Sequence, residues 1–267
     1  MKQSKEIVSR RHQQIIDLFN KKNPLYVTEL SQKLNVSELT VRRDLEALAK
    51  TGKLKRFHGG AQLFIQKDEQ TLAYSNKDMI AQEQKQQIAQ ITAQYIKDGD
   101  TVFLNAGTTT FEILKAVKDK RITVVTNNSL ASSILRNTNA SLISTGGEFN
   151  FTNLSYSGIL ATYLINKVFS SVTILGVNGL SAANGITTAY YPETMINQEF
   201  LKQSKGLKIV ACDGSKLGKT FSFNTSPIVG IDIVITDSSA CPEEIEKIKA
   251  QGVTVVMADI ELKKEKR

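Results

Sequence analysis

The sequence predicts two folding units, a small and mainly helical one over residues 1–65 and a larger α/β one over residues 85–267. Two observations lead to this division. Apolar residues recur at helical spacing in the first unit, which then ends in two apolar runs around a pair of glycines. In the second unit, short apolar runs alternate with helical patterns, as in a domain built around a mainly parallel sheet. Residues 66–84 are polar, and we expect them to form a linker.

The composition is that of a globular protein with enough chain for a real core. Of the 267 residues, 41% are hydrophobic and 22% are charged. No run approaches the roughly 20 apolar residues of a membrane span, and the N-terminus is charged rather than apolar, so we expect a cytoplasmic protein without a membrane partner. Cys212 and Cys241, with two histidines, are too few for a disulfide framework or a zinc cluster. We therefore expect a reduced protein that holds no metal and needs no cofactor.

The positive charge is concentrated at the beginning of the chain. Residues 1–61 contain 13 Lys and Arg against 6 Asp and Glu, a net charge of +7, whereas the whole chain has +8. A basic block of this kind is typical of a unit that binds a polyanion. The alternative is a basic surface that is merely solvated. The local pattern of residues has to distinguish between the two.

Two helices are predicted before residue 35. Apolar side chains recur at three- and four-residue steps in the first, at Val8, Ile15, Leu18 and Phe19, and Pro24 ends it. After a brief extended piece at residues 26–27, Thr28 is a favourable N-cap for a short helix over residues 29–34. A tight turn follows.

A third helix is predicted over residues 38–50, with Ser37 as its N-cap. Its inward stripe consists of Val41, Leu45 and Leu48. Two short helices joined by a tight turn, with basic and hydroxyl residues opening the second, fit the helix-turn-helix plan. The major groove admits a helix whose Arg and Thr side chains reach base edges and phosphates. The candidate DNA-binding residues on this helix are Ser37, Thr40, Arg42 and Arg43.

A hairpin is predicted after the third helix, where residues 54–57 and 61–65 flank His58-Gly59-Gly60. The two glycines permit the positive φ of a tight turn. A hairpin beside a recognition helix is a wing, which adds Lys55, Arg56 and His58 to the candidate DNA contacts. Ion pairing with Glu38, Asp44 or Glu46 would be the simpler explanation of an isolated Arg pair. Here the helices, the hairpin and the net charge agree, and DNA is favoured.

Two segments of this unit carry a resemblance to a known family. They are Val36-Ser-Glu-Leu-Thr-Val-Arg-Arg-Asp-Leu45 and Gly52-Lys-Leu-Lys-Arg-Phe-His-Gly-Gly-Ala61. Together they closely resemble the signature of the DeoR family of bacterial transcriptional regulators. The resemblance implies a winged helix-turn-helix domain that binds double-stranded operator DNA.

The second unit is predicted to hold seven strands in a mainly parallel sheet. The strands are expected at residues 101–104, 122–126, 141–145, 172–177, 207–211, 231–236 and 253–257. Helices are expected at residues 109–118, 129–136, 156–165, 193–205 and 242–249, after an entering helix that ends at Asp98-Gly99.

Four polar loops follow predicted strands, and ligands of such sheets bind beyond the carboxyl ends of the strands. In the first loop, Gly107 lets the backbone approach a ligand, and the next helix offers free N–H groups that suit a phosphate. The alternative for this loop is an ordinary helix cap that binds no ligand. The alternative for Lys216 is a loop lysine that is merely exposed to solvent. Together the loops predict a pocket for a small, anionic, hydroxyl-rich molecule. The candidate effector-binding residues are Asn105, Gly107, Thr108, Thr109, Thr110, Thr126, Asn127, Gly146, Gly147, Asp213 and Lys216.

The second unit also resembles the DeoR family, in its C-terminal sensor domain. The matching residues are Gly107-Thr-Thr109, Thr126-Asn127, Gly146-Gly147, Gly158, Gly185, Asp213, Ser215-Lys216 and Ile235-Thr-Asp237. The resemblance implies a fold similar to ribose-5-phosphate isomerase and glucosamine-6-phosphate deaminase. It implies a homo-oligomer, dimer or tetramer, that represses a carbohydrate operon until a phosphorylated sugar binds. The family usually has Asp at the position of Asn105, Lys-Arg in the helix where Asn197-Gln198 stand, and often Arg at Lys77.

Two other functions stay open on the sequence alone. One is a sugar-phosphate isomerase or deaminase with a nucleic-acid-binding tether, which would need a base near its substrate. Asn105 lacks the basicity of a carboxylate, and Asp213 remains as a candidate base. The other is a regulator whose sensor domain has lost its ligand and serves assembly.

Overall fold

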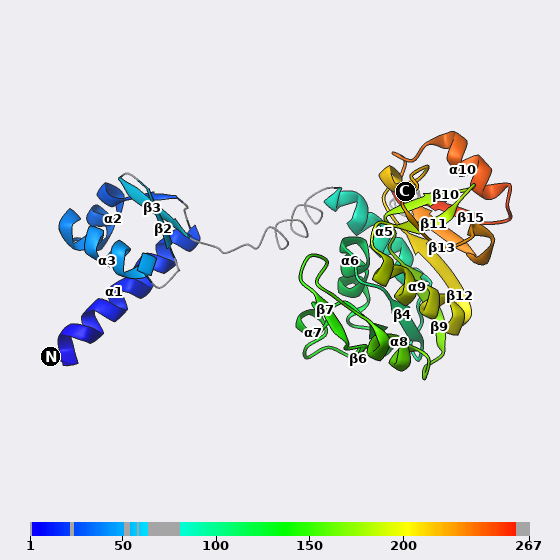
Figure 1. The fold of residues 1–267 in the computed structure, drawn as a ribbon, viewed down its shortest axis with the longest axis horizontal. Helices are drawn as coiled ribbons and strands as arrows, with labels where there is room; N and C mark the ends of the chain where they lie inside the picture. Colours follow the sequence, from blue (N-terminus) through cyan, green and yellow to red (C-terminus); the bar gives the residue numbers. More distant parts are fainter. Residues whose placement is uncertain (1, 22–23, 51–53, 58, 64–80, 260–267) are drawn as a thin grey trace. The chain divides into compact units, whose positions relative to one another are not determined.

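The structure, a computed structural model, describes residues 2–21, 24–50, 54–57, 59–63 and 81–259 (Figure 1). The chain divides into two compact units, Met1–Lys67 and Asp68–Arg267. Of the expected linker over residues 66–84, the part up to residue 80 lies outside the described residues. In the described part of the chain, every helix is too short or too polar to cross a membrane.

The first unit packs three helices against a small antiparallel sheet. Its elements are α1 (Lys2–Lys21), β1 (Leu25–Tyr26), α2 (Val27–Leu34), α3 (Glu38–Lys50), β2 (Leu54–Phe57) and β3 (Gly60–Leu63). The strands lie in the order β1-β3-β2. The core joins the apolar faces of all three helices to the sheet, through Ile15, Phe19, Leu25, Leu30, Val41, Leu45, Leu48, Leu54 and Ala61. This confirms the predicted helices and hairpin.

The start of α2 differs from the prediction. The helix begins at Val27 rather than Glu29, so Thr28 is not its cap. The backbone N–H of Tyr26 donates to the Glu29 carboxylate across 3.4 Å, which fixes the entry of the chain into the helix. Asn35, in the left-handed conformation with φ 51°, ends α2.

The hairpin uses its two glycines differently. Gly59 has φ +90°, the conformation expected of a tight turn. Gly60 is needed for close approach instead, because a Cβ there would lie 2.5 Å from the carbonyl oxygen of Leu25 in β1. The second glycine therefore lets β1 pair with β3. His58 lies outside the described residues.

The second unit is built on a seven-stranded parallel sheet, which confirms the α/β prediction. The strands are β4 (Thr101–Leu104), β5 (Thr123–Thr126), β6 (Ser141–Ser144), β9 (Ser170–Leu175), β12 (Ser204–Ala211), β14 (Ile233–Thr236) and β15 (Thr254–Met257). All seven predicted strands are present, with ends shifted by up to three residues.

Helices cover both faces of this sheet. They are α5 (Gln82–Gln94), α6 (Thr108–Val117), α7 (Ala131–Ile134), α8 (Ile159–Ile165), α9 (Tyr191–Gln203) and α10 (Pro242–Lys249). Side chains alternate along each strand, so Val102 and Leu104 pack with α5, α6 and α7, while Phe103 packs with α8 and α9. The two faces thus carry two separate apolar clusters.

Five short antiparallel strands were not predicted. They are β7 (Glu148–Asn150), β8 (Ser155–Ser157), β10 (Gly179–Ser181), β11 (Gly185–Thr188) and β13 (Phe223–Ser226). One of them corrects the predicted helix over residues 156–165. Tyr156 belongs to β8, and Gly158, with φ +85°, separates that strand from α8. Two short 3₁₀ helices complete the unit, η1 (Gly214–Lys216) and η2 (Ile228–Gly230).

The strand order places a crevice in the middle of the sheet. The order is β15-β14-β12-β9-β4-β5-β6. From β4 the chain first adds β5 and β6 on one side and then returns to add β9, β12, β14 and β15 on the other. In open α/β sheets ligands bind where the winding direction reverses, at the carboxyl ends of the strands. Here that point lies between β4 and β9.

Candidate functional site

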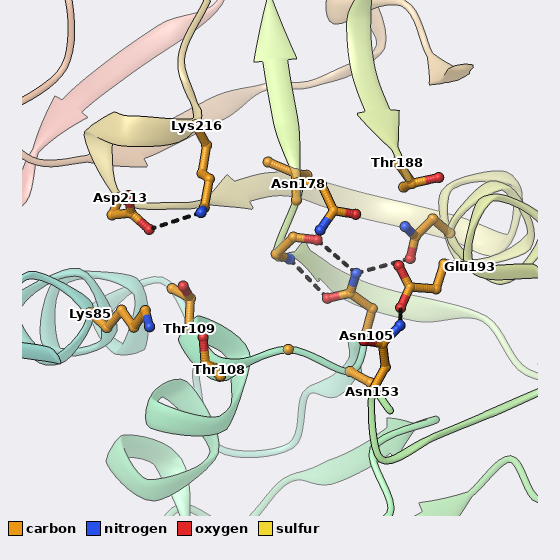
Figure 2. Close-up of a pocket in the computed structure, with 15 residues that line it drawn as sticks. Lys85, Asn105, Thr108, Thr109, Asn153, Asn178, Thr188, Glu193, Asp213 and Lys216 are labelled. Carbon is orange, nitrogen blue, oxygen red and sulfur yellow. Dashed lines mark hydrogen bonds and ion pairs between the residues drawn. The ribbon is translucent and has the colours of Figure 1, made fainter. Parts of the chain in front are cut away.

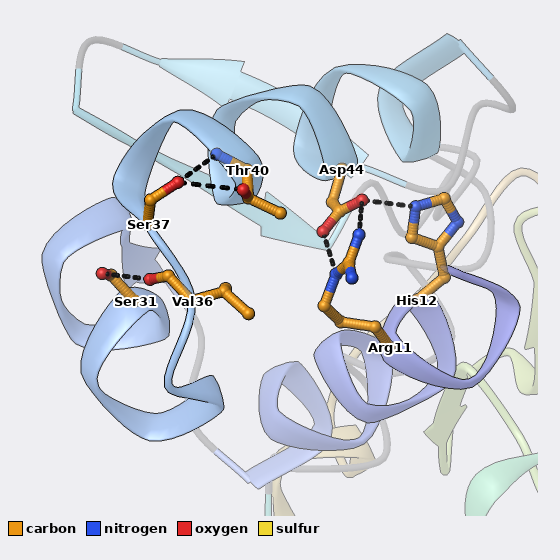
Figure 3. A network of polar contacts seen from close by, with 7 residues as sticks. All are labelled: Arg11, His12, Ser31, Val36, Ser37, Thr40 and Asp44. Carbon is orange, nitrogen blue, oxygen red and sulfur yellow. Dashed lines mark hydrogen bonds and ion pairs between the residues drawn. The ribbon is translucent and has the colours of Figure 1, made fainter. Parts of the chain in front are cut away.

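The exposed side of α3 carries the predicted DNA-binding residues. The Thr40 backbone N–H donates to Ser37 Oγ across 3.2 Å, so Ser37 caps the helix as expected (Figure 3). Arg42 lies 3.5 Å from the Glu38 carboxylate, and both side chains are about half exposed. Arg43 is exposed and has no ion pair with any described residue. Ion pairing on the helix surface therefore accounts in part for Arg42 but does not account for Arg43.

The inner side of α3 holds Asp44, which the sequence offered only as a possible ion-pair partner of the two arginines. Asp44 is buried, and its carboxylate receives Arg11 Nε at 2.5 Å and Nη2 at 3.0 Å. Its Oδ1 also lies 3.1 Å from His12 Nε2 (Figure 3). The hydrogen bond from Arg11 to Asp44 raises the pKa of Arg11. Asp44 thus ties α1 to the recognition helix and is not a partner for Arg42.

The wing residues lie on the hairpin strands as far as the structure describes them. In the pairing of β2 with β3, Lys55 is opposite Gln62 and Arg56 is opposite Ala61. Arg56 is exposed. The unit to which it belongs carries most of the net positive charge of the chain. These positions agree with a wing that contacts DNA backbone.

A cavity of about 130 Å³ lies at the crevice between β4 and β9 in the second unit (Figure 2). A single water needs roughly 10–15 Å³ of such space, so the cavity has room for a small metabolite. Six predicted effector-binding residues line it: Asn105, Gly107, Thr108, Thr109, Asp213 and Lys216. Its other polar lining comes from residues that the sequence reading did not select: Lys85, Asn153, Asn178, Thr188, Glu193 and Asn197.

The start of α6 opens into the cavity. Gly107 precedes the helix, and among the residues that the structure describes no side chain caps its first turn. The first N–H groups of any helix have no partner within it, and the helix dipole adds positive potential there. Lys85 from α5 and Lys216 from η1 line the same cavity, the first of them almost completely buried. This end suits an anion.

Asn105 forms the floor of the cavity through three hydrogen bonds. Its Nδ2 donates to the Gly176 carbonyl at 2.8 Å and to Asn197 Oδ1 at 2.9 Å. Its Oδ1 accepts the Gly176 N–H at 2.8 Å. The amide therefore joins the end of β4 to the loop after β9 and to α9.

Asp213 is held within its own loop. Its Oδ1 accepts the Ser215 backbone N–H at 3.1 Å and also the Ser215 hydroxyl. Its Oδ2 lies 4.0 Å from Lys216 Nζ. Asp237, at the end of β14, accepts the Gly214 N–H at 2.8 Å and fixes η1 from below. The carboxylate of Asp213 thus lies close to the charge of Lys216.

The opposite end of the cavity is formed by α9 and the short strands. Glu193, in the first turn of α9, accepts the Asn153 amide at 2.7 Å. Asn153 belongs to the turn between β7 and β8, and Thr188 ends β11. One sequence feature points to Glu193. It follows Pro192 at the start of a helix, where a carboxylate is favourable.

Five predicted effector-binding residues do not line the cavity but support the loops around it. Thr110 Oγ1 donates to the Asn105 carbonyl at 2.7 Å, and Asn127 Oδ1 accepts the Ala106 N–H at 2.8 Å. Thr126 Oγ1 accepts the Asn128 N–H at 3.0 Å. The glycine pair allows a tight turn after β6, with φ +60° at Gly146 and +106° at Gly147.

Comparison with known proteins covers both units. Residues 11–67 match the DeoR-like helix-turn-helix domain, and residues 80–238 match the DeoR C terminal sensor domain. The chain is 33% identical to the uncharacterized HTH-type transcriptional regulator YulB of Bacillus subtilis (strain 168), over 93% of this chain and 96% of that protein. It is 30% identical to the lactose phosphotransferase system repressor of Lactococcus lactis subsp. lactis, over 94% and 98% of the two chains.

The similarity to solved structures is weaker. Ribose 5-phosphate isomerase A from Neisseria gonorrhoeae has a TM-score of 0.37 and 14% identity, over 50% of this chain and 52% of that one. A likeness of this size adds nothing to the sequence relationship. Both units match the family in the same order, and the relatives align over nearly their whole length. The chain belongs to the DeoR family of helix-turn-helix transcriptional regulators.

Proposed function

We propose that this protein represses an operon of carbohydrate metabolism and releases it when a phosphorylated sugar enters the cavity of the second unit. The observation that carries the proposal is the cavity itself, which brings the uncapped start of α6 together with Lys85 and Lys216. The lactose phosphotransferase system repressor among the relatives supports a sugar operon as the target.

The phosphate would bind at the α6 end of the cavity. Backbone N–H groups at a helix start point toward a ligand there, and the helix dipole favours its negative charge. The hydroxyls of Thr108 and Thr109 would add hydrogen bonds, and Lys216, which lies 4.0 Å from the Asp213 carboxylate, would add charge. The sugar hydroxyls would then meet the amides and hydroxyls at the other end, among them Asn153, Asn178 and Thr188.

The first unit would hold the operator in the cytoplasm. Its recognition helix α3 would enter the major groove, with Thr40, Arg42 and Arg43 at base edges or phosphates. Arg56 on the wing would contact the backbone. A homo-oligomer would present its recognition helices to half-sites about 34–36 Å apart, or a multiple of that spacing.

The cavity offers little support for catalysis on a sugar phosphate. A proton transfer between carbons needs a positioned base near the substrate. The amide of Asn105 cannot serve as that base, and of the two carboxylates that line the cavity in the described part of the chain, Asp213 accepts from Ser215 and Glu193 accepts from Asn153. We expect no turnover of pentose or hexose phosphates above background. Sustained catalysis would instead support the alternative function, a sugar-phosphate isomerase or deaminase.

The test is operator binding with and without effector. Fluorescence anisotropy on the promoter of the protein's own gene cluster should show that the correct sugar phosphate weakens binding by about 5–150-fold. Lys216→Ala should keep operator affinity and lose this response, with Lys247→Ala on α10 as the matched control. If no sugar phosphate changes the operator affinity, the proposal is contradicted. That result would favour a sensor domain that has lost its ligand and serves assembly.

A further inference from the structure

The outer side of α8 is apolar and open to solvent. Its inner side is packed into the core of the second unit, where Ile165 is fully buried. A helix that is apolar on both sides is normally covered on both. The outer side of α8 is left uncovered in the part of the chain that the structure describes. We call its exposed apolar residues, together with the one that follows the helix, the α8 face: Ile159 (80% exposed), Leu160 (67%), Tyr163 (63%) and Phe169 (61%).

The α8 face has the apolar area that one partner brings to a stable interface. Large apolar side chains each have on the order of 200 Å² of surface, so at these exposures the four present on the order of 500 Å². A standard interface takes about 800 Å² from each partner, and about 60% of that area is apolar. The α8 face by itself would supply this apolar share.

The two ends of α8 carry charges of opposite sign. Glu148, an exposed residue of β7, lies at the beginning of the helix, because a Cβ on Gly158 would be 2.8 Å from Glu148 Oε1. Lys167, also exposed, lies at the other end, with Nζ 4.9 Å from the centre of the Tyr163 ring. The seven residues of α8 between them include no charged side chain.

A second copy of the same chain fits this pattern. Across a twofold axis perpendicular to the helices, two copies of α8 run antiparallel, and each surface meets an identical one. Glu148 of each copy then lies at the end of the other helix that carries Lys167. Lys205, whose Nζ is 4.7 Å from the centre of the Phe169 ring, adds positive charge near that end. The uncharged centre places no like charges opposite each other, and the antiparallel helix dipoles attract.

We propose that two copies of the chain pair through the α8 face, with the helices antiparallel and Glu148 of each copy near Lys167 of the other. The proposed function uses a homo-oligomer but assigns no surface to it. In the described part of the chain, no residue of α8 lines the cavity. Loss of pairing and loss of the response to a sugar phosphate are therefore separate results.

Sedimentation of the full chain tests the surface. We expect an even oligomer at micromolar concentration. Ile159→Glu should weaken the pairing at least about 100-fold, because each dimer would bury two carboxylates in place of two apolar side chains. Val229→Glu, at an apolar side chain that is 67% exposed on η2, should leave the mass unchanged. A monomeric full chain, or an oligomer whose mass Ile159→Glu leaves unchanged, would overturn the inference and leave the α8 face to a different partner.

A pair of charge reversals tests the antiparallel arrangement at low salt. Glu148→Lys alone should weaken the pairing at least about threefold, because lysines would then face each other at both ends, and Lys167→Glu alone should do the same with carboxylates. An equal mixture of the two single variants should pair as tightly as the unaltered chain, since each lysine then faces a glutamate of the other copy. Rescue in the mixture also shows that both variants fold. A mixture that pairs no better than its separate components would overturn the arrangement.

Discussion

Asn105 shows at the scale of one residue how an amide can shape a ligand site. A carboxylate has no donor, yet Nδ2 of this side chain makes two donor contacts, to Gly176 and to Asn197. The sequence predicts it as a ligand contact because it opens the polar loop that joins a strand to a helix. The structure adds a second role, which is to join three segments of the chain.

Asn105→Asp should therefore destabilise the second unit by about 1–3 kcal/mol at neutral pH, since two acceptors would face a new carboxylate in a buried place. The loss should shrink as the pH falls, because a protonated Asp can restore one of the two hydrogen bonds that the amide donated. Urea unfolding of the full chain at two pH values measures both effects. Asn139→Asp, the same change at an exposed amide, should cost less than about 0.5 kcal/mol. A large, pH-independent loss at Asn105 would contradict the role of the donor.

The two cysteines differ in reactivity for a physical reason. Both thiols are free; Cys212 is buried and Cys241 is exposed. Burial, with a smaller contribution from the Asp213 charge, raises the pKa of the Cys212 thiol. Since the thiolate is the nucleophile, a raised pKa keeps Cys212 protonated and inert.

A thiol reagent should accordingly modify one cysteine per native chain at about pH 8 and the second one only after unfolding. Cys241→Ser should abolish the fast reaction, while Cys212→Ser should leave it unchanged. Two fast thiols in the native protein would show that the strand end at β12 opens to solvent.

At the scale of the elements, the seven parallel strands are the part of the fold that the sequence predicts best. A strand that is covered on both faces is a continuous apolar run, which is easy to recognise. The missed strands are three or four residues long and include polar ones, as in Ser155–Ser157. Four of them form local hairpins, β7 with β8 and β10 with β11, and only β13 pairs with a distant strand. Lys85 and Glu193 were missed for another reason, because helix packing alone brings them to the cavity.

The recognition helix allows a prediction about its two arginines. Arg43 has no ion pair with a described residue, whereas Arg42 is near Glu38. Arg43→Ala should weaken operator binding by about 1–3 kcal/mol if the side chain contacts a base, or chiefly reduce the salt dependence if it contacts phosphate. Titrations at several salt concentrations separate the two. Arg136→Ala, an equal loss of charge on the exposed surface of the second unit, is the control. Unchanged affinity and salt dependence in Arg43→Ala would refute the assignment of α3.

At the scale of the whole molecule, one chain combines a basic unit with a nearly neutral one. Residues 1–61 carry +7 of the total net charge of +8. Attraction to DNA is thus confined to the unit with the recognition helix, while the second unit contributes the cavity. Regulation then requires a free energy of coupling between two separate binding sites.

Coupling of this kind is reciprocal. If the effector weakens operator binding by some factor, operator DNA must weaken effector binding by the same factor, about 5–150-fold for a coupling of 1–3 kcal/mol. Calorimetry of the effector with the free protein and with the operator complex measures the second factor. Equal effector affinity for the free protein and for the operator complex would show that the effector does not act by weakening operator binding.

The parallel sheet also bears on how such regulators can diversify. Its apolar clusters lie on the two faces, whereas the cavity is lined by residues that follow the strands at one edge. Substitutions at partly buried lining positions, such as Thr108 and Asn178, can therefore change the preferred metabolite while the buried layers stay intact. Within this scaffold, a new chemical signal can be acquired without loss of folding stability.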